Sequence, residues 1–260
     1  MGESGRGRGG ARRNFIYRAE KAVIKAGALA EDMVFPRRCP MCHDAVPFGK
    51  RLCPGCVGKL PYVTGKRCAK CSQPVEEDEE LCDGCRERRH VFDRGLGVFI
   101  YEERMKEAVS YMKYRGRREY CGVLGELAGE AASGVPFIER CGVLVPVPIH
   151  ASRLRERGYN QAELIARAAG RALGKPVEGL LVRKTQTAAL KNLHSRERYR
   201  ELSEALEAAC GAPKEPILVV DDIFTSGATV DAAADALKRA GAPEVYFLTV
   251  CIGAGYLRQY

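Results

Sequence analysis

Along residues 91–255, two kinds of spacing between apolar residues alternate. Short apolar runs rich in β-branched residues predict strands, and stretches with apolar residues three and four positions apart predict amphipathic helices. The predicted strands are residues 96–101, 142–147, 217–220 and 244–252, and the predicted helices are residues 104–114, 119–132, 159–173 and 230–240. This alternation predicts an α/β fold, in which helices cover both faces of a parallel sheet and ligands bind at the carboxyl ends of its strands.

The N-terminal third of the chain has a different composition. Residues 1–13 are rich in Gly and Arg and poor in apolar side chains, which predicts a disordered tail. Residues 14–35 carry apolar side chains at helical spacing, which predicts an amphipathic helix that ends before Pro36. A small cysteine-rich module is expected at residues 36–90, followed by the α/β domain at residues 91–255.

Eight of the twelve cysteines lie in two copies of a C-x2-C-x10-C-x2-C pattern. The first copy is Cys39, Cys42, Cys53 and Cys56, and the second is Cys68, Cys71, Cys82 and Cys85. Zinc is held by four thiolates at tetrahedral corners, and each C-x2-C turn supplies two of them. The pattern therefore predicts structural zinc, because four thiolates leave no open position for a catalytic water.

The spacing leaves two questions about this module open. Adjacent C-x2-C turns could combine into one site, or turns from the two copies could interleave, and one site or both could be filled. His43 stands next to Cys42 and could replace a thiolate, although a solvent-exposed loop histidine is the simpler interpretation. The other four cysteines stand singly in apolar surroundings and are interpreted as small core residues: Cys121, Cys141, Cys210 and Cys251.

The overall composition narrows the class of protein. No apolar run is long enough to cross a bilayer, and no signal-peptide pattern opens the sequence, so a cytoplasmic location is expected. Twelve cysteines in a reducing compartment favour metal binding over disulfides. The net charge of +9 indicates polyanionic partners, either phosphate metabolites or nucleic acid.

The segment ILVVDDIFTSGAT, residues 217–229, has the residue types that hold a sugar phosphate. Its apolar run predicts a buried strand, after which Asp221 and Asp222 are placed to accept hydrogen bonds from two adjacent sugar hydroxyls. A loop of small residues follows, whose backbone N–H groups can surround a 5-phosphate at the start of a helix: Thr225, Ser226, Gly227, Ala228 and Thr229. The alternative is a buried strand that ends in a solvated Asp pair and a capped helix.

A second anion-binding segment is predicted after the strand at residues 142–147. Pro146 and Pro148 are expected to end the strand, and Arg153, Arg155 and Arg157 follow on a predicted loop. Guanidinium groups at a strand end suit a pyrophosphate, because they make bidentate contacts with its oxygens. An R-x-R-x-R run by itself is more often a solvated face.

The motif at residues 217–229 resembles the PRPP-binding motif of type I phosphoribosyltransferases, and the chain as a whole resembles the ComF competence-protein family. The resemblance is carried in family order by the cysteine pattern, Lys113-Tyr114-Arg115-Gly116, PVPIHASRLRERGYNQAE, TAALKNLHSRERYREL and VVDDIFTSGAT. It implies a double zinc ribbon before a type I phosphoribosyltransferase-like domain that binds PRPP with Mg²⁺. It also implies a link to natural transformation, with single-stranded DNA or the DNA-uptake helicase machinery as partners.

The chain departs from the family pattern at residues 187–202, where Leu190 and Glu201 replace a Gln and an Asn. This segment is expected to form the mobile loop over the active site. Its candidate cations, with Lys113 from the earlier motif, are Lys191, Arg196 and Arg198. Some purine-salvage transferases place a general base within the phosphate loop, where this chain has Thr225.

Two classes of function are therefore carried forward. The first is an enzyme of nucleoside metabolism that transfers a phosphoribosyl group, with Arg153 and Arg157 neutralising the departing pyrophosphate. The second is a module that senses PRPP or binds single-stranded DNA without catalysis, with tyrosines as stacking faces. Those tyrosines are Tyr62, Tyr101, Tyr111 and Tyr114, although packing is the simpler interpretation for each.

Overall fold

The computed structural model describes residues 36–185 and 195–254. The tail and helix predicted for residues 1–35, together with Leu190 and Lys191, lie outside these ranges. The chain divides into two compact units, Met1–Val57 and Gly58–Tyr260. The first cysteine group belongs to the smaller unit, and the second belongs to the larger unit with the sheet.

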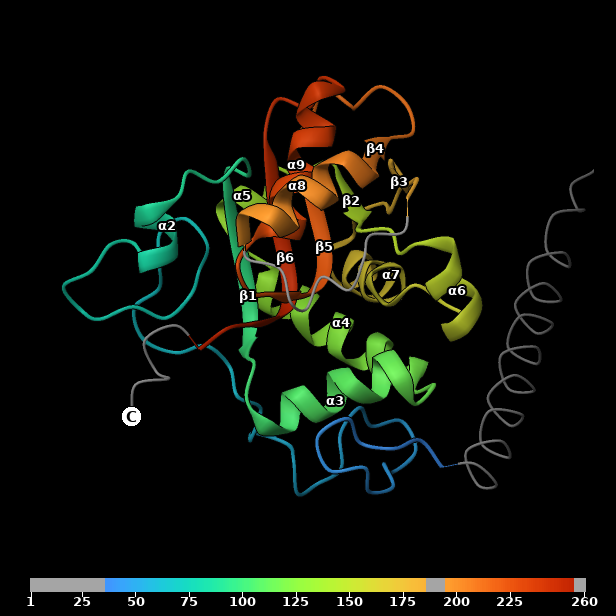
Figure 1. Ribbon diagram of the computed structural model, residues 1–260. Helices are drawn as coiled ribbons and strands as arrows, with labels where there is room; N and C mark the ends of the chain where they lie inside the picture. The colour runs from blue at the N-terminus through green and yellow to red at the C-terminus, as the bar shows by residue number, and fades with distance from the viewer. Residues whose placement is uncertain (1–35, 186–194, 255–260) are drawn as a thin grey trace, which may run out of the picture. The chain divides into compact units, whose positions relative to one another are not determined.

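A four-stranded sheet organises the larger unit (Figure 1). Its order is β1-β6-β5-β2, and every neighbouring pair is parallel. The strands are β1 (Arg94–Ile100), β2 (Val143–Pro146), β5 (Ile217–Phe224) and β6 (Val245–Ile252). All eight residues of β6 are buried, as expected for a central parallel strand covered on both faces. The predicted parallel α/β fold is confirmed.

Helices cover both faces of this sheet. The long helices are α3 (Glu103–Tyr114), α4 (Arg118–Ala132), α7 (Gln161–Leu173), α8 (Ser195–Ala205) and α9 (Ala228–Arg239). Val143 and Val145 belong to the core cluster that contains the apolar residues of α9. Leu144, between them, faces α7, since a Cβ at Gly170 would lie 3.8 Å from its Cδ2. Alternate residues of β2 therefore face opposite layers.

The remaining elements are short. They comprise α2 (Asp83–Glu87), α5 (Pro136–Glu139), α6 (Ala151–Arg157) and an antiparallel pair formed by β3 (Leu181–Arg183) and β4 (Leu206–Ala208). None of the helices in the described ranges is both long and apolar enough to cross a membrane.

One strand prediction is confirmed and one needs correction. β2 ends at Pro146, as predicted, and Pro146 is its last residue in register with β5, opposite Val220. β2 is an edge strand, so the missing N–H of a proline is tolerated there. β5 extends four residues beyond the predicted end at Val220, because Asp221, Ile223 and Phe224 continue to pair with β6. The two aspartates therefore lie within the strand.

Candidate functional site at the carboxyl edge of the sheet

Each copy of the cysteine pattern forms its own four-thiolate group. Cys39, Cys42, Cys53 and Cys56 make one group, and Cys68, Cys71, Cys82 and Cys85 make the other, with the sulfur atoms of each group within 4.8 Å of one another. Adjacent C-x2-C turns therefore combine, and interleaving is excluded. Two closed sets of four thiolates fit structural zinc.

The remaining cysteines only partly follow the prediction. All twelve cysteines of the chain are free of disulfides. Cys121, Cys141 and Cys251 are buried, as predicted for small core residues, whereas Cys210 is exposed. Cys210 follows directly after β4 and precedes Gly211, so the apolar stretch that suggested burial ends at a surface turn. His43 is half-buried and lies outside the first four-thiolate group.

The loop between β5 and α9 is shorter than predicted. Thr225, Ser226 and Gly227 form it, and α9 begins at Ala228, so Ala228 and Thr229 lie in the first helical turn. Gly227 is the N-cap with φ +77°, a left-handed conformation that favours glycine. Within the described chain, Ser226 Oγ is a buried atom without a hydrogen-bond partner. A helix N-terminus beside an unused hydroxyl has the electrostatics of an anion site.

The two aspartates of the motif have different surroundings. Asp222 is 7% exposed, and Lys113 Nζ donates to both of its carboxylate oxygens at 3.0 and 2.8 Å. Asp221 is half-buried, and its Oδ1 accepts a hydrogen bond from the backbone N–H of Asp222 at 2.8 Å. Burial, and then the charge of Asp222, raise the pKa of Asp221 to about 7. By exposed surface, Asp221 is nevertheless the less buried of the two residues.

The position of Lys113 explains its charge. Burial alone lowers the pKa of Lys113, but the Asp222 carboxylate outweighs that influence and raises the pKa above its usual value. The ammonium is consequently fixed on α3 as the partner of Asp222.

The three arginines predicted on a loop lie on a helix instead. Arg153, Arg155 and Arg157 belong to α6, which is capped by His150 at its start and by Gly158 with φ +78° at its end. The His150 ring nitrogen Nδ1 accepts from the Ser152 N–H at 3.2 Å, and this local cap starts a two-turn helix shortly after Pro148. Arg153 and Arg155 are exposed, whereas Arg157 is half-buried.

Arg157 connects α6 to the end of α3. Its Nη1 donates to Gln161 Oε1 at 3.0 Å, and its guanidinium carbon lies 5.4 Å from the ring centre of Tyr114. The Tyr159 hydroxyl donates to the Met112 carbonyl oxygen at 2.5 Å, next to Lys113. These contacts place α6 next to the end of α3 that carries Lys113.

Arg183 is a site residue that the sequence did not predict. It is the last residue of β3. Burial lowers the pKa of Arg183; the charge of Asp221 opposes this effect, and the charge of Arg153 adds to it. The three groups therefore lie within electrostatic reach of one another. An arginine at the end of the apolar run 180–182 is the sequence signal that could have found it. Of the other candidate cations, Arg196 and Arg198 lie on α8.

Parts of the chain are similar to known proteins. A double zinc ribbon domain matches residues 30–86. The chain is 32% identical over 146 residues to competence protein ComFC of Bacillus subtilis (strain 168), a match that covers 55% of this chain and 58% of that protein. It is 25% identical to the DNA utilization protein YhgH of Escherichia coli (strain K12), over 82% of this chain and 89% of that protein.

The resemblance to the ComF competence-protein family is confirmed. The chain spans 58% of the length of the B. subtilis protein ComFC, which is less than two thirds. Among solved structures, a glutamine PRPP amidotransferase of B. subtilis aligns with 55% of this chain and 30% of its own, at 19% identity and a TM-score of 0.39. The fold class rests on the parallel sheet and the two cysteine groups.

Proposed function

We propose that the chain binds a phosphoribosyl ligand, PRPP being the leading candidate, at the carboxyl ends of β5 and β2. The observation that carries this proposal is the loop Thr225–Gly227 at the N-terminus of α9, with Ser226 Oγ buried and unpartnered. A phosphate in the loop would meet the backbone N–H groups and this hydroxyl. Asp221, with its partly exposed carboxylate, lies on β5, the strand that leads into this loop.

Each group of the site has a role in this proposal. Asp221 accepts from one ribose hydroxyl, and Asp222 accepts from the other when Lys113 shares its carboxylate. Arg153, Arg155 and Arg157 neutralise the pyrophosphate, with Arg183 as a further cation near Asp221. Mg²⁺ would accompany the pyrophosphate and screen its charge, with most of its ligands from water and the substrate. Zinc is structural and takes no part in the chemistry.

The proposed reaction is transfer of the phosphoribosyl group to a nucleophile as pyrophosphate departs. Removal of negative charge from the departing group by the α6 arginines is the electrostatic contribution of the protein. Thr225 supplies no general base, so the acceptor either needs none or takes one from elsewhere. Binding without turnover is the alternative within the same site.

Calorimetric titration with PRPP and Mg²⁺ tests the binding step. We expect binding by the intact chain and its loss in Asp221→Asn/Asp222→Asn. Asp235→Asn is the matched control, because Asp235 lies on α9 and pairs with Arg239 at 3.1 Å, outside the loop. Release of pyrophosphate in the presence of bases or nucleotides then separates an enzyme from a binding module. Absence of PRPP binding by the intact chain would overturn the proposal.

A second function, binding of single-stranded nucleic acid, is favoured by one surface. Tyr114 is 54% exposed, at the end of α3, and Arg157 stacks against its ring. Exposed arginines follow it in the turn before α4, at the start of α4 and on α6, namely Arg115, Arg118, Arg153 and Arg155. A stacking face among cations is the surface that tracks a single strand. The names of the relatives, competence and DNA utilization, support a role in DNA uptake.

Fluorescence anisotropy with a labelled oligothymidylate at several salt concentrations tests this second function. We expect salt-sensitive binding that weakens about tenfold or more in Tyr114→Ala. Tyr62→Ala is the control, since Tyr62 is 41% exposed and its ring packs 4.8 Å from that of Phe99 on β1. Equal loss in both variants, or none in either, would remove Tyr114 as a stacking face.

A further inference from the structure

The segment that leaves the second cysteine group runs directly to the phosphate loop. Cys85 is the last thiolate of that group, and β1 begins nine residues later at Arg94. Between them Arg88 donates from Nη2 to the carbonyl oxygen of Ser226, the central residue of the loop. The same Nη2 lies 3.7 Å from a carboxylate oxygen of Asp231 on α9. One arginine therefore touches both the loop and the helix that follows it.

Asp231 fixes the same segment with both of its oxygens. It lies in the first turn of α9 and is 3% exposed. Its Oδ2 lies 2.8 Å from His90 Nδ1, and its Oδ1 accepts from the Val91 N–H at 2.8 Å. The His90 ring in turn packs over the N-cap, since a Cβ at Gly227 would lie 2.9 Å from His90 Cε1. The loop is thus contacted at Ser226 and at Gly227 by residues that follow the second cysteine group.

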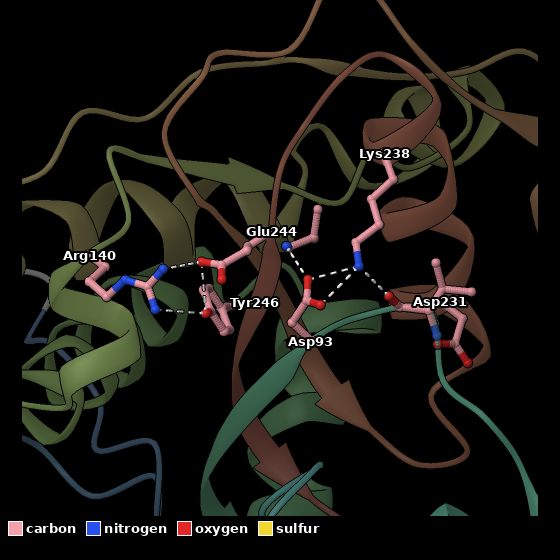
Figure 2. A network of polar contacts seen from close by, with 8 residues as sticks. Asp93, Arg140, Asp231, Lys238, Glu244 and Tyr246 are labelled. Carbon is pink, nitrogen blue, oxygen red and sulfur yellow. Dashed lines mark hydrogen bonds and ion pairs between the residues drawn. The ribbon is translucent and has the colours of Figure 1, made fainter.

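The C-terminal end of α9 also contacts the segment of residues 88–93. Lys238 Nζ donates to the Val91 carbonyl oxygen at 2.9 Å and to Asp93 Oδ1 at 3.0 Å, and Asp93 Oδ2 accepts from the Val245 N–H at 2.7 Å. Figure 2 shows Lys238 pointing from its helix toward Asp93, with Asp231 beside it. Residues 88–93 therefore make hydrogen bonds with both ends of α9, through Asp231 at its start and Lys238 at its end.

The second cysteine group is itself part of the core beneath the loop. Cys68, Cys71 and Cys82 are buried in the same cluster as Phe92 and Phe224. Phe224 immediately precedes the loop, and its ring lies edge-on to Phe92 at 5.8 Å. The free energy of metal binding by four thiolates contributes to the folding of the segment that carries them. Occupancy of this group therefore stabilises the segment that restrains the loop.

Resting on the proposed function, we propose that Arg88, His90 and Asp231 are positioning residues of the phosphate loop, and that metal occupancy of the second cysteine group sets its affinity for a phosphate ester. When the segment loosens, only part of the population presents the loop in its binding conformation. The apparent dissociation constant then rises by the inverse of that fraction. The first cysteine group belongs to the other compact unit and supplies none of these three residues.

Arg88→Met is the variant that tests the contact to the loop. Its matched control is Arg86→Met, because Arg86 stands two residues away and pairs with Asp83 at 2.5 Å and Glu79 at 2.6 Å on the exposed side of α2. We expect Arg88→Met to weaken binding of PRPP with Mg²⁺, and of ribose 5-phosphate alone, about tenfold or more. Arg88→Lys should restore part of that affinity, and Arg86→Met should leave it unchanged.

Amide hydrogen exchange at residues 225–231 gives a measurement that does not depend on the ligand. Loss of the restraint should speed exchange there about tenfold in Arg88→Met and in Asp231→Ala, while the rates in β6 stay unchanged. If the intact chain binds neither ligand, the proposed function fails, yet the exchange measurement still tests the positioning role. Unchanged exchange and unchanged affinity in Arg88→Met would overturn the inference.

The metal is tested with a matched pair of cysteine substitutions. Cys85→Ser alters the second group and Cys56→Ser alters the first, each at its fourth thiolate. After the zinc content of each variant is measured, we expect weaker PRPP binding and faster loop exchange only in Cys85→Ser. Equal effects of the two substitutions would contradict the link. If Cys85→Ser does not fold, the Arg88 variants still decide the positioning role.

Discussion

Lys113 Nζ lies 2.8 Å from Asp222 Oδ2, and this ion pair joins the end of α3 to the strand that carries the carboxylates of the site. The side chains are 23% and 11% exposed, so both charges are largely removed from water. Residues that stand 109 positions apart therefore depend on each other for charge compensation. The Lys113-Tyr114-Arg115-Gly116 segment and the aspartate motif form one electrostatic unit.

Loss of the lysine should destabilise the fold. Lys113→Met keeps the length of the side chain but leaves Asp222 as an uncompensated carboxylate in a mostly dry site. We expect the free energy of unfolding to fall by about 2–4 kcal/mol, because an unpaired buried charge is costly. Urea denaturation monitored by circular dichroism measures the change.

The double variant Lys113→Met/Asp222→Asn provides the control for this prediction. With both charges removed, the free energy of unfolding should return to within about 1–2 kcal/mol of the original value. A loss in Lys113→Met below about 0.5 kcal/mol would mean that water or another cation already compensates Asp222.

Asp221 should make stability depend on pH in a predictable direction. Its pKa in the folded chain is raised to about 7, above the ordinary value of 3.8, so the folded state binds a proton more readily than the unfolded chain between these limits. Its contribution to stability is full below about pH 4 and is lost as pH rises through 7. Asn at this position stays neutral throughout. Asp221→Asn should therefore raise the free energy of unfolding at pH 8, by at most about 4 kcal/mol, and change it little at pH 4.

Thermal unfolding of Asp221→Asn across pH 4–8 measures this dependence. Asp235→Asn is the control, because Asp235 is 31% exposed and pairs with Arg239 on the surface of α9. Its effect should be small and nearly constant with pH. A stabilisation of Asp221→Asn that does not grow between pH 5 and pH 8 would contradict the raised pKa.

The strands and helices of the sheet could be predicted because periodicity records which faces are buried. Residues 217–220 and the sequence of β6 are each an almost uninterrupted run of apolar residues, as strands covered on both faces require. The boundaries were less predictable where a polar residue continues a strand. Asp221 and Asp222 lie within β5 because Asp221, Ile223 and Phe224 continue to pair with β6 past the apolar run, and composition does not record that pairing.

The cysteine groups could be predicted from spacing alone, but their pairing and the contacts of the site could not. Tertiary contacts decide which turns combine, and they also place Lys113 on Asp222 and Arg183 near Asp221. The α6 helix was missed because its cap is a histidine, a residue type that seldom signals a helix start. His90 and Asp231 were missed because neither stands in a recognisable motif.

The two cysteine groups predict a stoichiometry of two zinc ions per chain. Inductively coupled plasma mass spectrometry of the purified protein measures it. Cys53→Ser and Cys82→Ser should each remove one ion, because three thiolates hold zinc less tightly than four. Cys210→Ser is the control, since Cys210 is exposed and belongs to neither group. A single ion in the intact chain, or loss of both ions from either substitution, would contradict two independent sites.

The glycine at the N-cap of α9 should be more sensitive to substitution than its backbone conformation alone requires. Gly227 has φ +77°, and an alanine Cβ there would lie 2.9 Å from His90 Cε1 and 3.1 Å from Phe224 Cε2. Gly158 has the same conformation, φ +78°, but no atom lies within 4 Å of the corresponding position. Both substitutions incur the left-handed penalty of about 1–2 kcal/mol, and only Gly227→Ala must also displace the His90 ring.

Urea denaturation of the two alanine variants separates these contributions. We expect Gly227→Ala to lower the free energy of unfolding by about 1–3 kcal/mol more than Gly158→Ala, because the added methyl group overpacks a buried ring. His90→Ala/Gly227→Ala should reduce that excess, since the ring that collides with the methyl group is gone. Equal destabilisation by the two single variants would show that His90 moves aside freely, and the loop would then not be held by the histidine.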